Sequence, residues 1–114
     1  MIARINLGMD NASKYGIGYL EMVSLLSSAI RDYGKLDCTC SKMSKGGDWK
    51  PEPILIADID VSEWVGFNRA LEALCVVLNE DSIAVSLIGR EGYLIFHPNY
   101  TGERYPFNFD YFLN

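Results

Sequence analysis

The chain has little that would support a covalent framework or a membrane anchor. Three of its 114 residues are cysteine, an odd number that argues against a disulfide framework. No apolar run approaches the roughly 20 residues that a membrane-spanning helix needs. The first eight residues alternate like a strand and do not form an apolar leader. These absences predict a cytoplasmic protein in reducing surroundings, without membrane contact.

Basic residues are also scarce. Ten lysines and arginines stand against fifteen aspartates and glutamates, which gives a net charge of −5. Lys42, Lys45 and Lys50 are scattered over one loop region and form no basic stripe. A nucleic-acid-binding domain usually carries such a stripe, so direct nucleic-acid binding is disfavoured. An acidic surface of this kind can instead meet a basic groove on a partner protein.

The composition that remains is that of one globular domain. Hydrophobic residues make up 49% of the chain and charged residues 22%, which are ordinary values for a protein with a packed core. Periodicity and turn residues predict seven elements. They are strands over Ile2–Met9, Leu36–Met43, Ile54–Val61, Ser82–Ile88 and Tyr93–His97, and helices over Tyr19–Tyr33 and from an N-cap at Ser62 to Asn79.

The order of these elements predicts an α+β two-layer sandwich. A β-α-β-β-α-β string describes the ferredoxin-like fold, in which two helices cover one face of an antiparallel sheet. Here a C-terminal hairpin strand and an aromatic tail would be added. Another α+β sandwich with the same string is the alternative. Residues 1–97 form the single domain in this interpretation, and residues 98–114 are an extension packed on it or on a neighbouring subunit.

That extension holds six of the fourteen aromatic residues. Disordered segments are poor in aromatics, so we expect it to pack. On the strand Ile54–Val61, odd-numbered residues would face the helices, leaving Ile54, Ile56, Asp58 and Asp60 outward. The tail could cover this open face or add a strand, in its own subunit or across a homodimer. Its candidate partner-binding residues are Tyr105, Phe107, Phe109, Tyr111 and Phe112.

Trp49 is a further candidate contact. It follows Gly46-Gly47-Asp48 in a segment that reads as an exposed loop. Exposed tryptophans are enriched at interface hot spots. The alternative is that the loop folds back and buries the ring under Pro51 or Pro53, and the sequence does not decide between the two.

A small-ligand site is the competing interpretation. Asp58 and Asp60 place two carboxylates about 7 Å apart on one strand face, where they could share a divalent cation or divide acid and base roles. Gly16 and Gly18 precede a helix, and Lys14 and Arg4 could supply counter-charges to an anion there. Against this, alternating acids are usually a solvated strand face, and the glycines lack the rest of a nucleotide-binding motif.

Other reactive residues predict no metal or cofactor. Cys38 and Cys40 share a strand face, but only Cys75 and His97 could complete a zinc site, and the spacing is not that of a zinc knuckle. His97, the one histidine, has no nucleophile motif beside it. A surface histidine and a buried helical thiol are the simpler readings.

Three segments resemble small uncharacterised proteins of phages and other mobile elements. They are Ile5-Asn-Leu-Gly8, Glu52-Pro53-Ile54-Leu55 and the run Leu78-Asn-Glu-Asp-Ser-Ile-Ala-Val85. The likeness covers about residues 1–88 and departs at Glu80-Asp81, where Gln-Glu is expected. It implies a fold and a mobile-element origin but carries no catalytic residues.

Together these observations favour a non-enzymatic protein-binding or inhibitor protein, directed at a host protein if the resemblance holds. A binder or enzyme for a small anion or metal, using Asp58 and Asp60, is the alternative.

Overall fold

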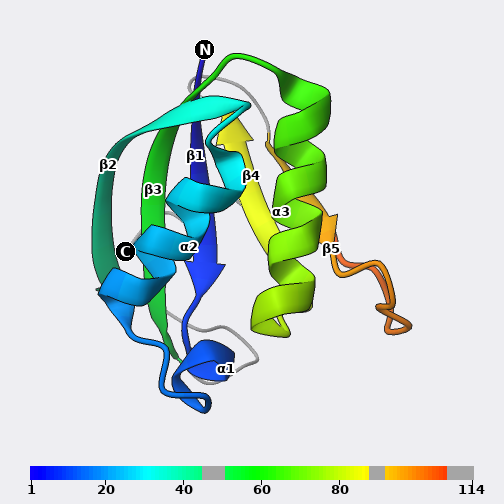
Figure 1. The fold of residues 1–114 in the computed structure, drawn as a ribbon. Helices are drawn as coiled ribbons and strands as arrows, with labels where there is room; N and C mark the ends of the chain where they lie inside the picture. The colour runs from blue at the N-terminus through cyan, green and yellow to red at the C-terminus, as the bar shows by residue number, and fades with distance from the viewer. Residues whose placement is uncertain (45–50, 88–91, 108–114) are drawn as a thin grey trace.

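A five-stranded antiparallel sheet with helices on one face forms the body of the protein. The computed structural model describes residues 1–44, 51–87 and 92–107. The elements are β1 (Ile2–Gly8), α1 (Asp10–Ser13), α2 (Tyr19–Ile30), β2 (Gly34–Met43), β3 (Pro53–Val61), α3 (Trp64–Leu78), β4 (Ser82–Leu87) and β5 (Gly92–Phe96). The strand order is β2-β3-β1-β4-β5. Helices α2 and α3 lie side by side over the sheet (Figure 1).

The core lies between the sheet and these two helices. On β3, Leu55, Ala57, Ile59 and Val61 point into it, as the alternation of the strand predicts. Helix α3 contributes Phe67, Leu71, Leu74 and Leu78 at helical spacing. The polar strand β2 lies at one edge of the sheet and pairs with β3.

The first long helix differs from its predicted form. It ends at Ile30, and the chain then turns through Arg31–Tyr33 so that Gly34 can enter the sheet opposite Val61. Its buried residues are Met22, Leu26 and Ile30, whereas Leu20 is 76% exposed. Leu20 therefore faces away from the core, although it is apolar. Leu20 lies about 200° around the helix from Met22.

The start of α3 is also one residue later than predicted. Glu63, not Ser62, is the N-cap, and its carboxylate accepts hydrogen bonds from the backbone N–H groups of Val65 (3.1 Å) and Gly66 (2.6 Å). The backbone N–H groups of Ser62 and Glu63 both donate to the carbonyl of Tyr33, which holds Ser62 outside the helix. Asn79 ends α3 in the left-handed region, with φ 55°, as expected of a residue that stops a helix.

Two further differences concern the loops. The segment between the first predicted strand and the first predicted helix was assigned no element, but Asp10–Ser13 forms the short helix α1 within it. The strand predicted over Ser82–Ile88 ends at Leu87 within the described residues, and residues 88–91 lie outside them. Among the described residues, no helix is long and apolar enough to cross a membrane.

Candidate functional site

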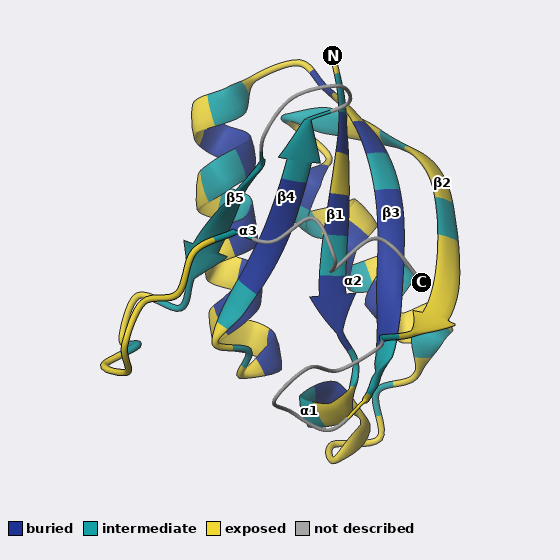
Figure 2. Ribbon diagram, turned by 180° about the vertical axis from the view of Figure 1, so that it is seen from behind, coloured by how far each residue is buried: buried dark blue, intermediate teal, exposed yellow. Residues whose placement is uncertain are grey.

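The face of the sheet opposite α2 and α3, here called the open face, carries three of the predicted site residues, Arg4, Asp58 and Asp60. Figure 2 shows it from the front, with buried stretches on the central strands. Ile54, Ile56 and Ala84 belong to this face, yet they are only 2%, 6% and 5% exposed. Neither long helix reaches them. The centre of the open face is therefore buried and not exposed to solvent.

Three aromatic rings form a cluster at the β5 edge of the open face. The Phe96 and Tyr100 rings stack with centroids 5.2 Å apart, and Tyr105 meets Phe96 edge-on at 5.2 Å. The Arg104 guanidinium lies 4.5 Å from the Phe96 ring centroid. We call Phe96, Tyr100, Arg104 and Tyr105 the aromatic cluster. Pairwise ring and cation–π contacts of this geometry each contribute about 0.5–1.5 kcal/mol beyond burial.

Backbone hydrogen bonds hold the loop that builds this cluster. The His97 N–H donates to the carbonyl of Asp81 at 2.8 Å, and the Tyr100 N–H donates to the carbonyl of His97. The His97 Nδ1 accepts from the Asn99 N–H at 3.0 Å, so one ring nitrogen of the only histidine has a structural role. The Tyr100 hydroxyl donates to the carbonyl of Glu103. The loop is therefore held by hydrogen bonds among its own residues and by one to Asp81.

The chain then returns over β5. The Tyr105 hydroxyl makes a short hydrogen bond with Ser82 Oγ on β4. A side chain at Gly92 would collide with the ring of Phe107, which places that ring against the open face of β5. Residues 105–107 thus pack on their own sheet. Of the other predicted partner-binding residues, Trp49, Phe109, Tyr111 and Phe112 lie outside the described residues.

The two aspartates of the competing interpretation do face the open side, but each is paired. Arg4 donates from Nε to Asp58 Oδ1 (2.7 Å) and from Nη2 to Oδ2 (2.9 Å). These bonds, aided by the Cys38 thiol at 3.4 Å, lower the pKa of Asp58. Asp60 accepts from the Met1 α-amino group at 3.0 Å. Arg4 therefore acts as the partner of Asp58 in the sheet.

The glycine loop lies apart from that ion pair. Lys14 ends α1, Gly16 has φ +77°, and Gly18 is the N-cap of α2. Because α2 covers the opposite face of the sheet, Arg4 is not brought to this loop. The predicted grouping of Arg4 with Lys14, Gly16 and Gly18 around one anion is not assembled.

The thiol of Cys75 is separated from those of Cys38 and Cys40. Cys38 and Cys40 are exposed on β2, while Cys75 is buried in α3. Burial raises the pKa of Cys75 to about 12, and the hydrogen bond to Asp58 raises that of Cys38. Within residues 1–44, 51–87 and 92–107, no group of three or more His, Cys, Asp or Glu side chains is arranged to hold a metal.

An acidic cluster lies at the end of α3 and was not predicted from the sequence. Burial, followed by repulsion from Glu52, Asp81 and Asp10, raises the pKa of Glu80 to about 8. Its Oε1 is buried without a hydrogen-bond partner among the described residues. Burial also raises the pKa of Glu52, which accepts from the Asp10 N–H. Asp10, Glu52 and Glu80 come from separate segments of the chain, so no local sequence pattern predicts that they meet.

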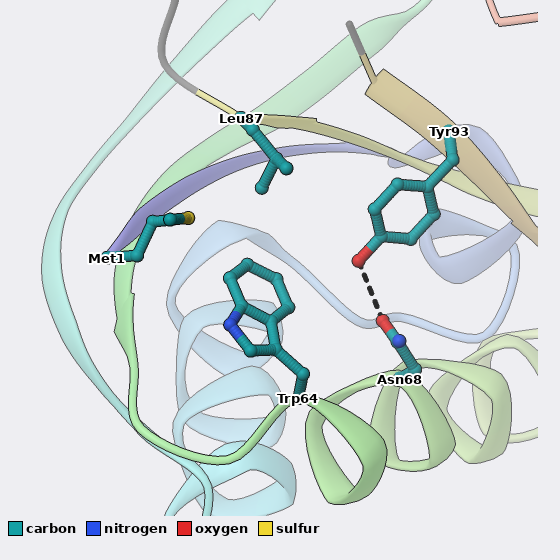
Figure 3. Close-up of a pocket in the computed structure, with 5 residues that line it drawn as sticks. All are labelled: Met1, Trp64, Asn68, Leu87 and Tyr93. Carbon is teal, nitrogen blue, oxygen red and sulfur yellow. Dashed lines mark hydrogen bonds between the residues drawn. The ribbon is translucent and has the colours of Figure 1, made fainter. Parts of the chain in front are cut away.

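A shallow hollow of about 550 Å³ lies on the helix side, next to α3. Figure 3 shows Trp64, Met1 and Leu87 around it, with the Tyr93 hydroxyl donating to Asn68 Oδ1 at 2.8 Å. That hydrogen bond uses the polar group of Tyr93, so the walls offered to a ligand are mostly apolar. Nothing in its lining suggests catalysis.

Comparison of the chain with protein-family models, with curated proteins and with solved structures gave no match. The functional argument therefore depends on the arrangement of the residues.

Proposed function

We propose that this protein is a non-enzymatic protein-binding or inhibitor protein, and that the aromatic cluster on the open face is its contact surface. One observation carries the proposal. Three aromatic rings and an arginine from β5 and residues 98–105 are gathered at the surface, outside the core between the sheet and its helices. Tyrosine and arginine are, with tryptophan, the residues enriched at binding hot spots.

The partial exposure of the cluster supports this role. Tyr105 is 37% exposed, and Arg104 is exposed above Phe96. Rings held by their neighbours lose little conformational entropy on binding, because their positions are already fixed. A partner that covered the cluster would gain apolar contact from the rings and a charge-assisted hydrogen bond to Arg104.

The sheet topology supports a finer proposal for the fold. In the unit β1-α2-β2 the two strands are separated by β3, and in β3-α3-β4 they are separated by β1. Two interleaved units of this kind describe a ferredoxin-like sandwich, with β5 added at one edge. The resemblance to mobile-element proteins extends the proposal: the partner would then be a host protein whose groove is basic, which suits a chain of net charge −5, but which offers an acceptor group opposite Arg104.

The test is comparative binding. Wild-type protein and the variants Tyr100→Ala and Arg104→Ala would be used to capture proteins from a lysate of the native host, and the captured protein would then be purified and titrated. We expect at least tenfold weaker binding for each variant, about 1.4 kcal/mol. Leu20→Ala is the matched control, because Leu20 is exposed on the far side of the sheet. Equal affinity for all four proteins would contradict the proposal.

A further inference from the structure

Strand β5 is an edge of the sheet, with β4 on one side only (Figure 2). Among residues 1–44, 51–87 and 92–107, no strand pairs with its outer side. All five residues of β5 are partly exposed, whereas most residues of the interior strand β3 are buried. An edge strand of this kind can accept a strand from another chain through backbone hydrogen bonds.

The backbone groups that point outward from β5 are those of its even-numbered residues. The His97 N–H donates to the carbonyl of Asp81 at 2.8 Å, one residue beyond the ladder between β4 and β5. In an antiparallel pair, directly opposed residues alternate between hydrogen-bonded and non-hydrogen-bonded positions. Tyr93 and Ile95 therefore bond to β4, while Leu94 directs its N–H and its carbonyl to the outer edge.

A groove of about 530 Å³ lies along this edge and reaches from α3 to the aromatic cluster. Arg69 and Glu72 line it from α3, and its other lining residues include Leu94 and Phe96 of β5 and Arg104. Arg104 belongs to the open face through its contact with Phe96, whereas Arg69 belongs to the helix layer. The two guanidinium groups therefore flank the edge of β5 from opposite faces of the sheet.

The groove has an excess of positive charge, although the whole chain has a net charge of −5. Its charged lining residues are Arg69, Arg104 and Glu72. Both arginines are exposed, and neither forms an ion pair with another residue of the described part of the chain. A guanidinium group binds a carboxylate through paired, charge-assisted hydrogen bonds, so this groove favours an acidic ligand.

We propose that an extended acidic segment of a partner protein adds to the outer edge of β5 as a further strand. This inference rests on the proposed function, because the groove shares Phe96 and Arg104 with the aromatic cluster, and it names the part of the partner that meets this surface. The backbone of the segment pairs with Leu94. Successive side chains of a strand point to opposite faces, so acidic residues on its two faces bind Arg69 and Arg104.

A second copy of this chain fits the edge less well than an acidic segment. Its own groove would bring two more arginines and one more glutamate, so the interface would keep an excess of positive charge. An acidic segment instead neutralises both guanidinium groups. Glu72 is the one charged lining residue that opposes such a segment, and its removal should therefore strengthen binding.

The test uses synthetic octapeptides of valine and threonine with blocked termini. One peptide carries two neighbouring glutamates at its centre, and the other carries glutamines there. By fluorescence anisotropy we expect the glutamate peptide to bind at least tenfold more tightly than the glutamine peptide. Equal binding of the two peptides, or no binding of the glutamate peptide at about 1 mM, would overturn the proposal.

Charge variants identify the groove as the binding site. Arg69→Glu should weaken binding of the glutamate peptide at least tenfold, and Glu72→Gln should strengthen it. Arg31→Glu is the matched control, because it makes the same charge change at the exposed C-cap of α2. It should change the affinity less than twofold. Equal losses in Arg69→Glu and Arg31→Glu would mean that only the net charge matters and would overturn the proposal.

Leu94→Pro separates this inference from the proposed function. Because the Leu94 N–H points outward, proline there removes a donor from the edge and no bond to β4. We expect Leu94→Pro to lose the glutamate peptide, and Tyr100→Ala, whose site lies outside the groove lining, to keep it. Circular dichroism would check that both variants fold, and Arg69→Glu decides the same question if Leu94→Pro does not.

Two results would assign the edge differently. A partner protein that binds Tyr100→Ala weakly but binds Leu94→Pro and Arg69→Glu normally would overturn strand addition and leave the aromatic cluster as the contact surface. A wild-type dimer that Leu94→Pro dissociates in sedimentation equilibrium would assign the edge to a second copy, and would overturn the proposal as well.

Discussion

Arg4 and Asp58, 54 residues apart in sequence, are locked together across β1 and β3 by two hydrogen bonds of 2.7 and 2.9 Å. Their backbones are paired in the antiparallel register, so the side chains meet without any loop between them. Two parallel bonds from one guanidinium are stronger than a single contact and fix the orientation of both groups. The ion pair is therefore a structural part of the open face.

Asp58→Asn is expected to lower the free energy of unfolding by about 1 kcal/mol at pH 7. Because Arg4 lowers the pKa of Asp58 in the folded state, this stabilisation is present above the unfolded pKa of about 3.9 and is lost as the pH falls through the folded value. Urea unfolding of wild type and Asp58→Asn at pH 7 and at pH 3 measures the difference in stability and its dependence on pH. Asp60→Asn, at a site 61% exposed, is the control and should change little. A pH-independent effect of Asp58→Asn would argue against the ion pair as its cause.

Glu80→Gln should have the opposite pH dependence. The folded pKa of Glu80 is about 8, above its unfolded value, so folded protein binds an extra proton between roughly pH 4.5 and 8. Wild-type stability then falls as the pH rises through this range, and the variant lacks that fall. We expect the stability of the variant relative to wild type to rise by at least about 1 kcal/mol between pH 5 and pH 8.5.

The control for Glu80 is Glu72→Gln on the exposed side of α3, which should show no such trend. Chemical denaturation across this pH range measures both variants. A constant difference between Glu80→Gln and wild type would mean that Glu80 is already ionised at neutral pH.

Gly66→Ala should destabilise the protein although alanine is the better helix former by about 1 kcal/mol. A methyl group at position 66 would collide with the ring of Tyr33, which packs against the first turn of α3. We expect a net loss of about 1–3 kcal/mol. In Tyr33→Ala the same substitution should cost less, so a double-mutant cycle isolates the clash. Additive effects would show that the ring is not the obstacle.

Ending the chain after Pro98 should expose the open face. The truncation removes Tyr100, Tyr105 and Phe107 from Phe96 and Gly92. We expect a loss of stability of about 2 kcal/mol or more and increased binding of a hydrophobic dye. Thermal unfolding and light scattering measure the effect. A truncated protein as stable as the full chain would mean that these aromatics contribute nothing to their own domain.

The outline of this fold follows from local patterns, and each difference between the predicted and the observed elements has a physical cause. Alternation in Ile54–Val61 identified the two faces of β3, because a strand buries every second residue. Helix α2 buries Met22 and exposes Leu20, and the spacing of apolar residues in its first turn does not decide which of the two faces the core. Ser62 was chosen as the N-cap from its residue type, but the Tyr33 carbonyl, distant in sequence, binds its N–H and moves the cap to Glu63.

The site was harder to predict because it depends on long-range pairing. Arg4 and Asp58 were both singled out, but for an anion or metal site, since strand register is not visible in the sequence. Phe96 and Tyr100 were not singled out, and they join Tyr105 only through the turn at His97–Tyr100. The raised pKa of Glu80 likewise requires three segments to meet.

Site-specific cross-linking tests the central claim most directly. A photoreactive amino acid would be placed at Arg104 in the aromatic cluster, or at Leu20 on the opposite side of the molecule, and irradiated in the native host. The aromatic cluster as a contact surface predicts a discrete adduct with one heterologous protein from position 104 and none from position 20. The same adduct from both positions, or none from position 104 in a folded protein, would contradict it.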